Sequence, residues 1–147
     1  MNKLNRKMEY ALMALKFMSH KIPGELTTAK EISEALKVPF DATARVLQQM
    51  AQSGLLRAEY GAFGGYQIVR DLAKTTVNDL IEIIEGPVAI VKCMHVKEDC
   101  EVSEQCNILS PVHTLNRKLV DLYKSMNLKE LLLDRPTAPV KQEAQHV

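Results

Sequence analysis

The stretch Thr28–Arg70, TAKEISEALKVPFDATARVLQQMAQSGLLRAEYGAFGGYQIVR, decides the fold. Its first four residues match a capping box, in which threonine and glutamate side chains satisfy the free backbone amides at a helix start. The pattern predicts a helix over residues 28–36 that buries Ile32, Ala35 and Leu36.

A second helix of this stretch is predicted over residues 40–53, because Pro39 suits a first helical turn and Gly54 suits a helix end. One face of this helix is apolar and carries Ala44, Leu47 and Met50. The opposite face exposes the polar side chains Arg45, Gln48, Gln49 and Gln52.

Two strand-like runs, residues 55–59 and 66–70, flank the glycine-rich segment 61–65 and predict a β-hairpin, since glycine adopts positive φ in such a loop. Upstream, residues 4–20 have helical periodicity. The apolar stripe of that helix consists of Met8, Leu12, Leu15 and Met18. Three helices followed by a hairpin is the order of a winged helix-turn-helix, so the fold class is mainly α with a small β-hairpin.

Two further helices are predicted after the hairpin. Thr76 suits the N-cap of the first, which ends at Gly86. Its buried residues are predicted to be Leu80, Ile83 and Ile84. A long helix over residues 110–126 follows, with Ser110 as N-cap and Pro111 in the first turn.

Six apolar residues in and just before the long helix are spaced 4, 3, 4, 3 and 4 residues apart, which is a heptad seam. They are Ile108, Val112, Leu115, Leu119, Leu122 and Met126. In a chain of 147 residues this seam predicts a dimerisation helix. Packing of the same stripe on the chain's own core is the alternative and would give much the same pattern.

The chain divides into four regions. They are residues 1–85, a winged helix-turn-helix DNA-binding domain; 86–109, a cysteine loop; 110–133, the dimerisation helix and a short helix capped by Asn127; and 134–147, a polar tail predicted to be disordered. A content of 46% apolar and 25% charged residues is typical of soluble globular proteins. No segment has the pattern of a membrane span or a signal peptide, so we expect a cytoplasmic protein.

All three cysteines of the chain, Cys93, Cys100 and Cys106, fall within 14 residues. Their spacing lacks the tight pairs of zinc fingers and ribbons. An iron–sulfur cluster is wider and can accept thiolates from one open loop. An odd cysteine count argues against a secreted disulfide framework. The loop therefore predicts a metal or redox site, with a surface loop of incidental thiols as the alternative.

Charge is distributed unevenly along the chain. Residues 1–75 carry 11 Lys and Arg against 7 Asp and Glu, whereas residues 76–147 carry 8 against 11. A basic N-terminal half suits the phosphates of DNA.

In a winged helix the third helix enters the major groove, and the hairpin contacts the backbone or the minor groove. The β-hairpin of residues 55–70 is the wing of such a fold. The predicted DNA contacts are Asp41, Ala42, Thr43, Arg45, Gln48 and Gln49 in the third helix, and Arg57, Tyr60 and Phe63 in the wing. Phe63 is either an apolar wedge for the minor groove or a residue packed on the dimer.

Four segments resemble, in order, the Rrf2 family of transcription regulators. They are Lys7–Leu12, the wing Gly61–Tyr66, the cysteine loop and Asn127–Leu131. The resemblance extends to about Leu133 and implies homodimers that bind palindromic double-stranded DNA. It also implies an iron–sulfur cluster near the dimer interface, 4Fe–4S in preference to 2Fe–2S, whose state changes the affinity for DNA.

The resemblance also implies candidates for a fourth cluster ligand. Members that use histidine place it three residues after the third cysteine, where this chain has Leu109. Members that sense nitric oxide use an acidic residue in the first helix of the other subunit, and Glu9 occupies that place. His95 and His113 are rival ligands, and Glu9 is alternatively an ordinary surface carboxylate. Tyr60 stands where relatives that contact DNA through the wing often have arginine.

The leading hypothesis is a DNA-binding repressor or activator that senses cluster state, and hence redox conditions, nitric oxide or iron status. A cluster-free regulator that senses thiol oxidation or zinc is the second hypothesis. A cluster-delivery or electron-transfer protein without a DNA role is the third. No Ser-His-Asp order, phosphate loop or paired-acid motif stands out, so the sequence does not predict an enzyme.

Overall fold

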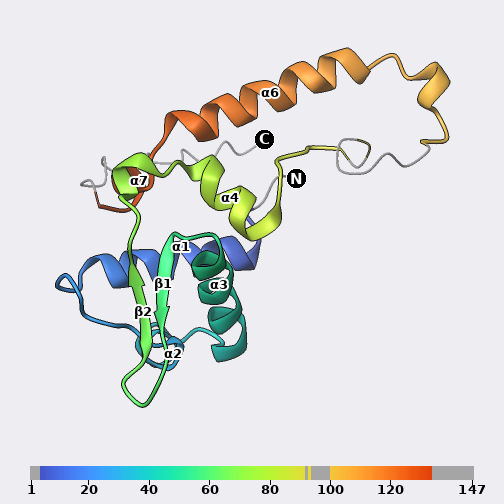
Figure 1. Cartoon of the computed structure of the whole chain (residues 1–147). Coiled ribbons are helices and arrows are strands. Elements are labelled where there is room, and N and C mark those ends of the chain that lie inside the picture. The colour runs from blue at the N-terminus through green and yellow to red at the C-terminus, as the bar shows by residue number, and fades with distance from the viewer. Residues whose placement is uncertain (1–3, 92, 94–99, 134–147) are drawn as a thin grey trace, which may run out of the picture.

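The computed structural model describes residues 4–91, 93 and 100–133. Helices α1, α2 and α3 and the β1–β2 hairpin form one body, and α4 lies between this body and the long helix α6 (Figure 1). The elements in order are α1 (Arg6–Ser19), α2 (Ala29–Leu36), α3 (Phe40–Gln52), β1 (Leu56–Glu59), β2 (Gly65–Ile68), η1 (Leu72–Lys74), α4 (Val77–Glu85), η2 (Ser103–Gln105), α6 (Leu109–Ser125) and α7 (Leu128–Leu133).

The hydrophobic core lies where α1 packs on α3 and α4. Its largest fully buried side chains include Met8 and Leu15 of α1, Leu47 and Met50 of α3, and Leu80 of α4. Burying one such side chain contributes about 1.5–3 kcal/mol to the free energy of unfolding. The apolar stripes predicted for these three helices thus meet in the core. One position of α4 differs, because Ile83 was predicted to be buried but is half-buried, whereas Ile81 is buried.

Side-chain caps fix the starts of α2 and α4 where the sequence predicted them. Before α2, Thr28 Oγ1 accepts a hydrogen bond from the Glu31 amide at 3.0 Å. The Glu31 carboxylate accepts from Lys21 instead of closing the predicted capping box, so only the threonine half of that box forms. Before α4, Thr76 and Asp79 exchange two hydrogen bonds of 3.0 and 2.8 Å, which is a complete capping box. Each cap contributes about 0.5–2 kcal/mol of stability.

The prediction for α2 is wrong at one position. Ile32 is buried and Leu36 is half-buried, but Ala35 is exposed. Ile32 and Leu36 lie four residues apart on the stripe that faces α3, and Ala35 lies at the edge of that stripe. A helix of eight residues covers only one narrow face of the core.

The hairpin pairs β1 with β2 in antiparallel register, with Arg57 opposite Gln67. Near its loop the hairpin is anchored to the body by Thr27 and Tyr66, whose backbones exchange two hydrogen bonds of 2.9 and 2.8 Å. A Cβ atom on Gly65 would lie 2.9 Å from the carbonyl oxygen of Thr27. Glycine at this position therefore permits the close approach that fixes the wing.

Helix α6 begins two residues earlier than predicted, because its first helical residue is Leu109 and not Pro111. Ile108 is its N-cap residue and supplies no side-chain hydrogen bond, so the prediction that Ser110 caps this helix is wrong. The amide of Val112 donates to the Ile108 carbonyl at 2.9 Å, which places Ser110 and Pro111 inside the first turn. Within residues 4–91, 93 and 100–133, no helix combines the length and apolar character needed to cross a membrane.

Two backbone hydrogen bonds return the chain from α6 to the core. The Val77 amide donates to the Met126 carbonyl at 2.9 Å, and the Leu128 amide donates to the Thr75 carbonyl at 2.8 Å. Asn127 caps α7 as predicted, by accepting a backbone hydrogen bond of 2.8 Å. α7 then packs on α1 and η1, with Leu128 fully buried. The last helix is therefore part of the winged-helix core.

Replacing Leu128 with alanine should lower the free energy of unfolding by about 2–5 kcal/mol, because the change leaves a cavity where α7 joins the core. Leu131→Ala on the same helix is the matched control, since Leu131 is 46% exposed and should cost much less. Urea unfolding followed by circular dichroism measures both variants. Equal losses of stability in the two variants would contradict the docking of α7 through Leu128.

Candidate functional site

α3 presents one polar stripe to solvent. Asp41, Arg45, Gln48 and Gln52 are exposed along it, at spacings of 4, 3 and 4 residues that place them on one helical face. The opposite face buries Val46, Leu47 and Met50 in the core, which turns the polar stripe outward. Gln52 was predicted to be exposed but was not among the predicted DNA contacts, although its place one turn after Gln48 indicates that it belongs with them.

Three other predicted contacts on α3 lie off this stripe. Thr43 is fully buried and its hydroxyl donates to the Pro39 carbonyl at 2.8 Å, which corrects the prediction that it contacts bases. Gln49 is half-buried, and its amide donates to the Ile84 carbonyl of α4 through a long hydrogen bond of 3.4 Å. Ala42 is half-buried at the first turn. Gln49 thus connects α3 to α4.

The wing carries two solvent-exposed aromatic side chains, Tyr60 and Phe63, each 95% exposed. Its loop lies at the end of the molecule opposite α6 (Figure 1), away from the helix with the heptad seam. Arg57 lies nearer the base, with its Nε atom 3.3 Å from a Glu59 carboxylate oxygen. Across the strand pair, the Gln67 amide oxygen, when turned toward Arg57, accepts from Nη2 at 2.6 Å. These contacts hold the Arg57 guanidinium along the hairpin.

A groove of about 490 Å³ lies between the polar stripe of α3 and strand β1. Gln48 lines it from the helix, and Arg57 and Tyr60 line it from the wing. Tyr66 also lines the groove. Burial, and to a smaller extent the neighbouring Tyr60, raises the pKa of the Tyr66 hydroxyl, so this group is a neutral hydrogen-bond donor near pH 7. The helix and the wing thus form one continuous surface.

Cys93 and Cys100 flank residues 94–99, which lie outside the part of the chain that the structure describes. His95 is one of these residues. Cys93 and Cys100 are exposed, Cys106 is half-buried, and all three are free thiols. Cys106 directly follows η2, and two residues separate it from the start of α6 at Leu109. Among the described residues, no group of three or more His, Cys, Asp or Glu side chains is close enough to hold a metal ion.

The candidate fourth ligands lie on two different helices. Glu9 is in the first turn of α1, where its carboxylate accepts from Arg6 at 2.9 Å and remains 43% exposed. His113 is exposed in α6, as is Leu109 at the start of that helix. The structure therefore leaves both the Glu9 carboxylate and the His113 imidazole accessible to a second molecule.

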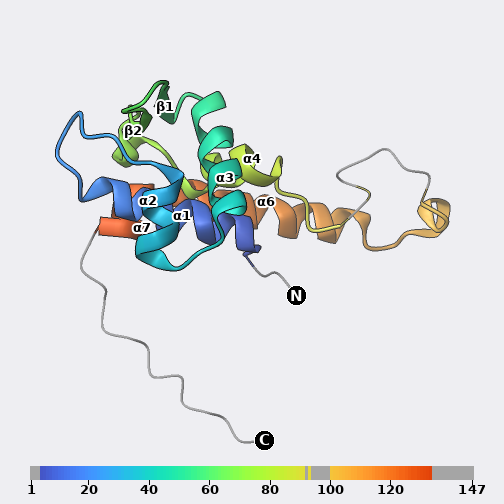
Figure 2. The same ribbon diagram turned by 90° about the horizontal axis from the view of Figure 1, so that it is seen from below.

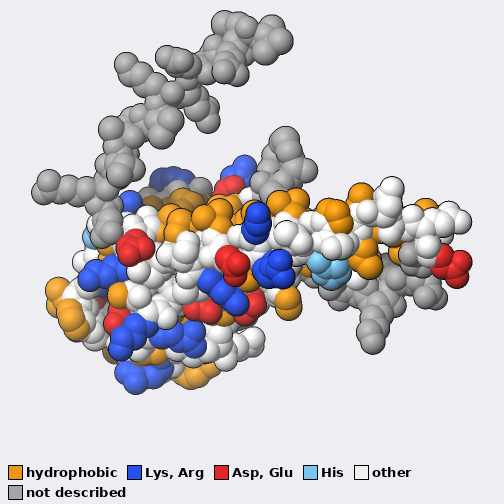
Figure 3. Space-filling model, turned by 90° about the horizontal axis from the view of Figure 1, so that it is seen from above, with side chains coloured by type: hydrophobic (Ala, Val, Ile, Leu, Met, Phe, Trp, Pro, Cys, Tyr) orange, Lys and Arg blue, Asp and Glu red, His pale blue; other side chains and the backbone are white. Residues whose placement is uncertain are grey.

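The heptad seam of α6 separates into two columns. Ile108, Leu115 and Leu122 are 57%, 54% and 53% exposed and recur every seven residues. Figure 3, which looks onto α6, shows hydrophobic side chains gathered along the helix. The alternating seam residues Val112, Leu119 and Met126 are half-buried, and Met126 packs against the core. One column thus faces the chain's own domain and the other faces solvent.

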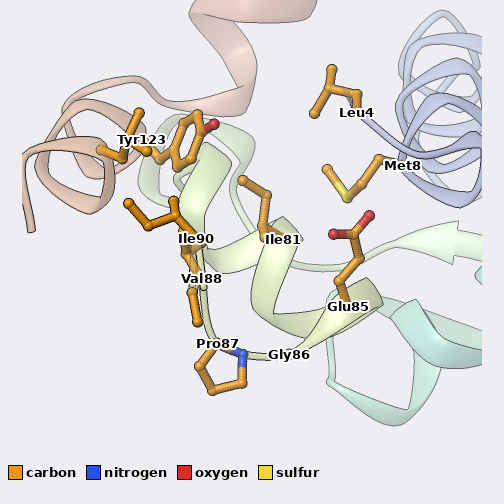
Figure 4. Close-up of a pocket in the computed structure, with 11 residues that line it drawn as sticks. Leu4, Met8, Ile81, Glu85, Gly86, Pro87, Val88, Ile90 and Tyr123 are labelled. Atoms are coloured by element: carbon orange, nitrogen blue, oxygen red, sulfur yellow. The ribbon is translucent and has the colours of Figure 1, made fainter. Parts of the chain in front are cut away.

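A cavity of about 230 Å³ lies between the start of α1, the end of α4, residues 86–90 and α6. Figure 4 shows the Glu85 side chain directed toward Met8 across this cavity. On the α6 side, Asn116 makes two hydrogen bonds to the segment: Oδ1 accepts from the Ile90 amide and Nδ2 donates to the Val88 carbonyl, both at 3.1 Å. This segment leads directly to Cys93.

A buried three-helix core, an outward polar stripe on the third helix and an anchored hairpin define a winged helix-turn-helix protein. A family model described as Rrf2, iron-dependent transcriptional regulator, matches residues 4–134. The chain belongs to the Rrf2 family of transcriptional regulators.

Individual relatives agree with this assignment. The HTH-type transcriptional regulator NsrR of Bacillus subtilis is 26% identical over 119 residues, covering 80% of each chain. The structure of CymR, the global cysteine regulator of B. subtilis, superposes with a TM-score of 0.67 at 23% identity, covering 90% of this chain and 97% of CymR. The structure of T. potens IscR gives a TM-score of 0.66 at 21% identity, covering 96% and 93%. The structural neighbours confirm the predicted fold class.

Proposed function

We propose that this transcriptional regulator binds its operator through the polar stripe of α3 and the wing together. The observation that supports this proposal is the groove whose two walls are formed by Gln48 of the helix and by Arg57 and Tyr60 of the wing. In the proposed complex Arg45 and Gln48 contact base edges, for which guanidinium and amide groups are suited. Asp41, Ala42 and Gln52 flank them along the helix, and Phe63 extends from the wing toward the minor groove.

We further propose that two copies associate through the exposed column of α6, Ile108, Leu115 and Leu122. Three large apolar side chains at heptad spacing form a continuous apolar row, and a second α6 supplies the matching surface. In this dimer the half-buried column of α6 stays packed on its own subunit. The orientation of α3 relative to the dimer contact is therefore the same in both subunits. A twofold dimer of this kind suits a palindromic operator on a chromosome, and hence a cytoplasmic location.

The donor set of the cysteine loop suits an iron–sulfur cluster, which three free thiols on one segment can ligate. Cys93, Cys100 and Cys106 would hold it, with Glu9 of the partner subunit as the fourth ligand. A bound cluster supplies one-electron redox chemistry and an iron that reacts with small molecules such as nitric oxide or oxygen. A carboxylate oxygen binds such iron less firmly than a thiolate does, so Glu9 would leave that iron exchangeable.

A regulator on the same fold without a cluster is the second candidate. It is favoured by the exposure of Cys93 and Cys100, because accessible thiols oxidise readily or bind zinc. Visible absorbance of protein purified without oxygen distinguishes the two candidates, since zinc complexes and disulfides are colourless.

Arg45→Ala and Gln48→Ala should each weaken operator binding by about 1–3 kcal/mol, because each removes a base contact. Arg57→Ala should weaken binding to all sequences and flatten its salt dependence, as a lost phosphate contact does. Lys118→Ala on α6 is the control, since it removes one exposed cation away from this surface. Fluorescence anisotropy with operator and scrambled duplexes, over a range of salt, measures all four. Unchanged operator affinity in both helix variants would mean that α3 does not contact the bases.

Leu115→Glu combined with Leu122→Glu should convert the protein to monomers and abolish tight binding to operators whose half-sites lie about 10 base pairs apart. Arg117→Glu combined with Lys124→Glu, which also places two carboxylates seven residues apart on exposed positions of α6 but on the side away from this column, should remain dimeric. Analytical ultracentrifugation at micromolar concentration gives the masses. A monomeric wild-type protein would contradict the proposal.

Serine at any one of the three cysteines should abolish the visible chromophore of anaerobically purified protein. Glu9→Ala should retain a chromophore that is lost faster and binds added ligands more readily, whereas the control Glu82→Ala, at an exposed position of α4, should behave as wild type. Loss of the cluster should change operator affinity by about 5- to 150-fold, the range of most allosteric couplings. Equal affinities of the cluster-bound and cluster-free protein across a range of salt would exclude the sensor function.

A further inference from the structure

We propose that Asn116 is a positioning residue that holds the start of the cysteine loop on α6. Its side-chain amide accepts from the Ile90 amide and donates to the Val88 carbonyl, both at 3.1 Å. One asparagine therefore satisfies two backbone groups of an extended segment, as a neighbouring strand would. The proposal rests on the proposed function of that loop, and it assigns a role to a residue outside the ligand set.

Apart from Asn116, the segment is held by apolar packing, since Val88 is half-buried against the core. Within the described part of the chain, residues 87–91 make no hydrogen bond to another backbone group. Residues 86–90 also border the cavity of about 230 Å³, together with Leu119 and Tyr123 of α6, so the apolar packing between this segment and α6 is incomplete. The two hydrogen bonds of Asn116 thus set the distance between α6 and the backbone three residues before Cys93. Cys106 lies close to the start of α6 in the sequence, and Asn116 binds the backbone before Cys93. Both ends of the cysteine loop are therefore attached to α6.

Asn116 also lies apart from the proposed dimer contact. It is half-buried on the side of α6 that faces α4, whereas Leu115 and Leu122 are exposed. Its replacement by alanine removes both hydrogen bonds without removing helix propensity, since alanine is the best helix former. Its effects can therefore be separated from those of dimer loss.

The first test uses the metal-free, full-length protein. Asn116→Ala should accelerate hydrogen exchange of the Ile90 amide, measured by NMR, by about 10-fold or more, as expected when the hydrogen bond that protects it is lost. Asn116→Asp retains the acceptor for that amide and should retain part of the protection. Arg117→Ala, at the exposed neighbouring position, should exchange as wild type. An unchanged Ile90 exchange rate in Asn116→Ala overturns the inference.

The second test uses protein that contains its chromophore. Asn116→Ala should lose visible absorbance in air about 10- to 100-fold faster than wild type, the effect usual for residues that orient metal ligands. The ratio of operator affinities with and without the cluster should also fall toward one, while the mass of the dimer stays unchanged. Equal chromophore lifetime and an equal affinity ratio in Asn116→Ala and wild type would refute the positioning role. A colourless wild-type protein would instead refute the cluster, and the exchange measurement would then decide the role of Asn116 by itself.

Discussion

The exchange of two backbone hydrogen bonds between residues 75–77 and 126–128 is the constraint on which the rest of the structure depends. These bonds, 2.9 and 2.8 Å long, join the end of α6 to the start of α4 inside the winged-helix core. The full burial of Leu128 beside them prevents this junction from opening. α6 therefore leaves the domain in one direction and extends beyond it at its N-terminal end (Figure 1 and Figure 2). Its exposed column and the polar stripe of α3 consequently have a fixed relative orientation, which a twofold DNA-binding protein requires.

Local signals in the sequence predicted the elements well, because the interactions that begin and end them join residues three or four positions apart. The caps at Thr28, Thr76 and Asn127 are of this kind. One error is local, since Ser110 does not cap α6. The other errors concern positions where tertiary packing decides. Thr43 has the residue type and the place of a base contact, but the docking of α3 on the core turns it inward, where its hydroxyl bonds the preceding turn. Ala35 fits an apolar stripe by type, yet the core does not extend over it.

The heptad seam shows a different limit of sequence reasoning. Dimerisation and packing on the chain's own core were alternatives for one stripe, and the structure divides that stripe between a half-buried and an exposed column. Both columns have the same seven-residue period, so periodicity could not separate them. The angle at which α6 docks on α4 separates them, and that angle depends on contacts far apart in the sequence. Asn116 did carry a local signal, because a polar residue beside the half-buried column needs a partner. Its partners lie 26 and 28 positions away, which no local pattern reveals.

The charges of the proposed DNA surface indicate how such a protein would obtain its affinity. The exposed stripe of α3 carries Arg45 but also Asp41, and Arg57 of the wing is paired with Glu59. These four side chains sum to no net charge, so the stripe and the wing by themselves add little net positive charge to the proposed DNA surface. In the proposed complex, Tyr60 and Phe63 would add affinity that does not depend on charge. Each exposes almost its whole aromatic surface, and burying that surface against sugars or bases is favourable. An aromatic wing of this kind favours sites that deform easily, whereas an arginine favours a narrow groove of high negative potential. With Tyr60 and Phe63 at its tip, the proposed wing would therefore depend less on electrostatic attraction and more on the shape and deformability of the operator.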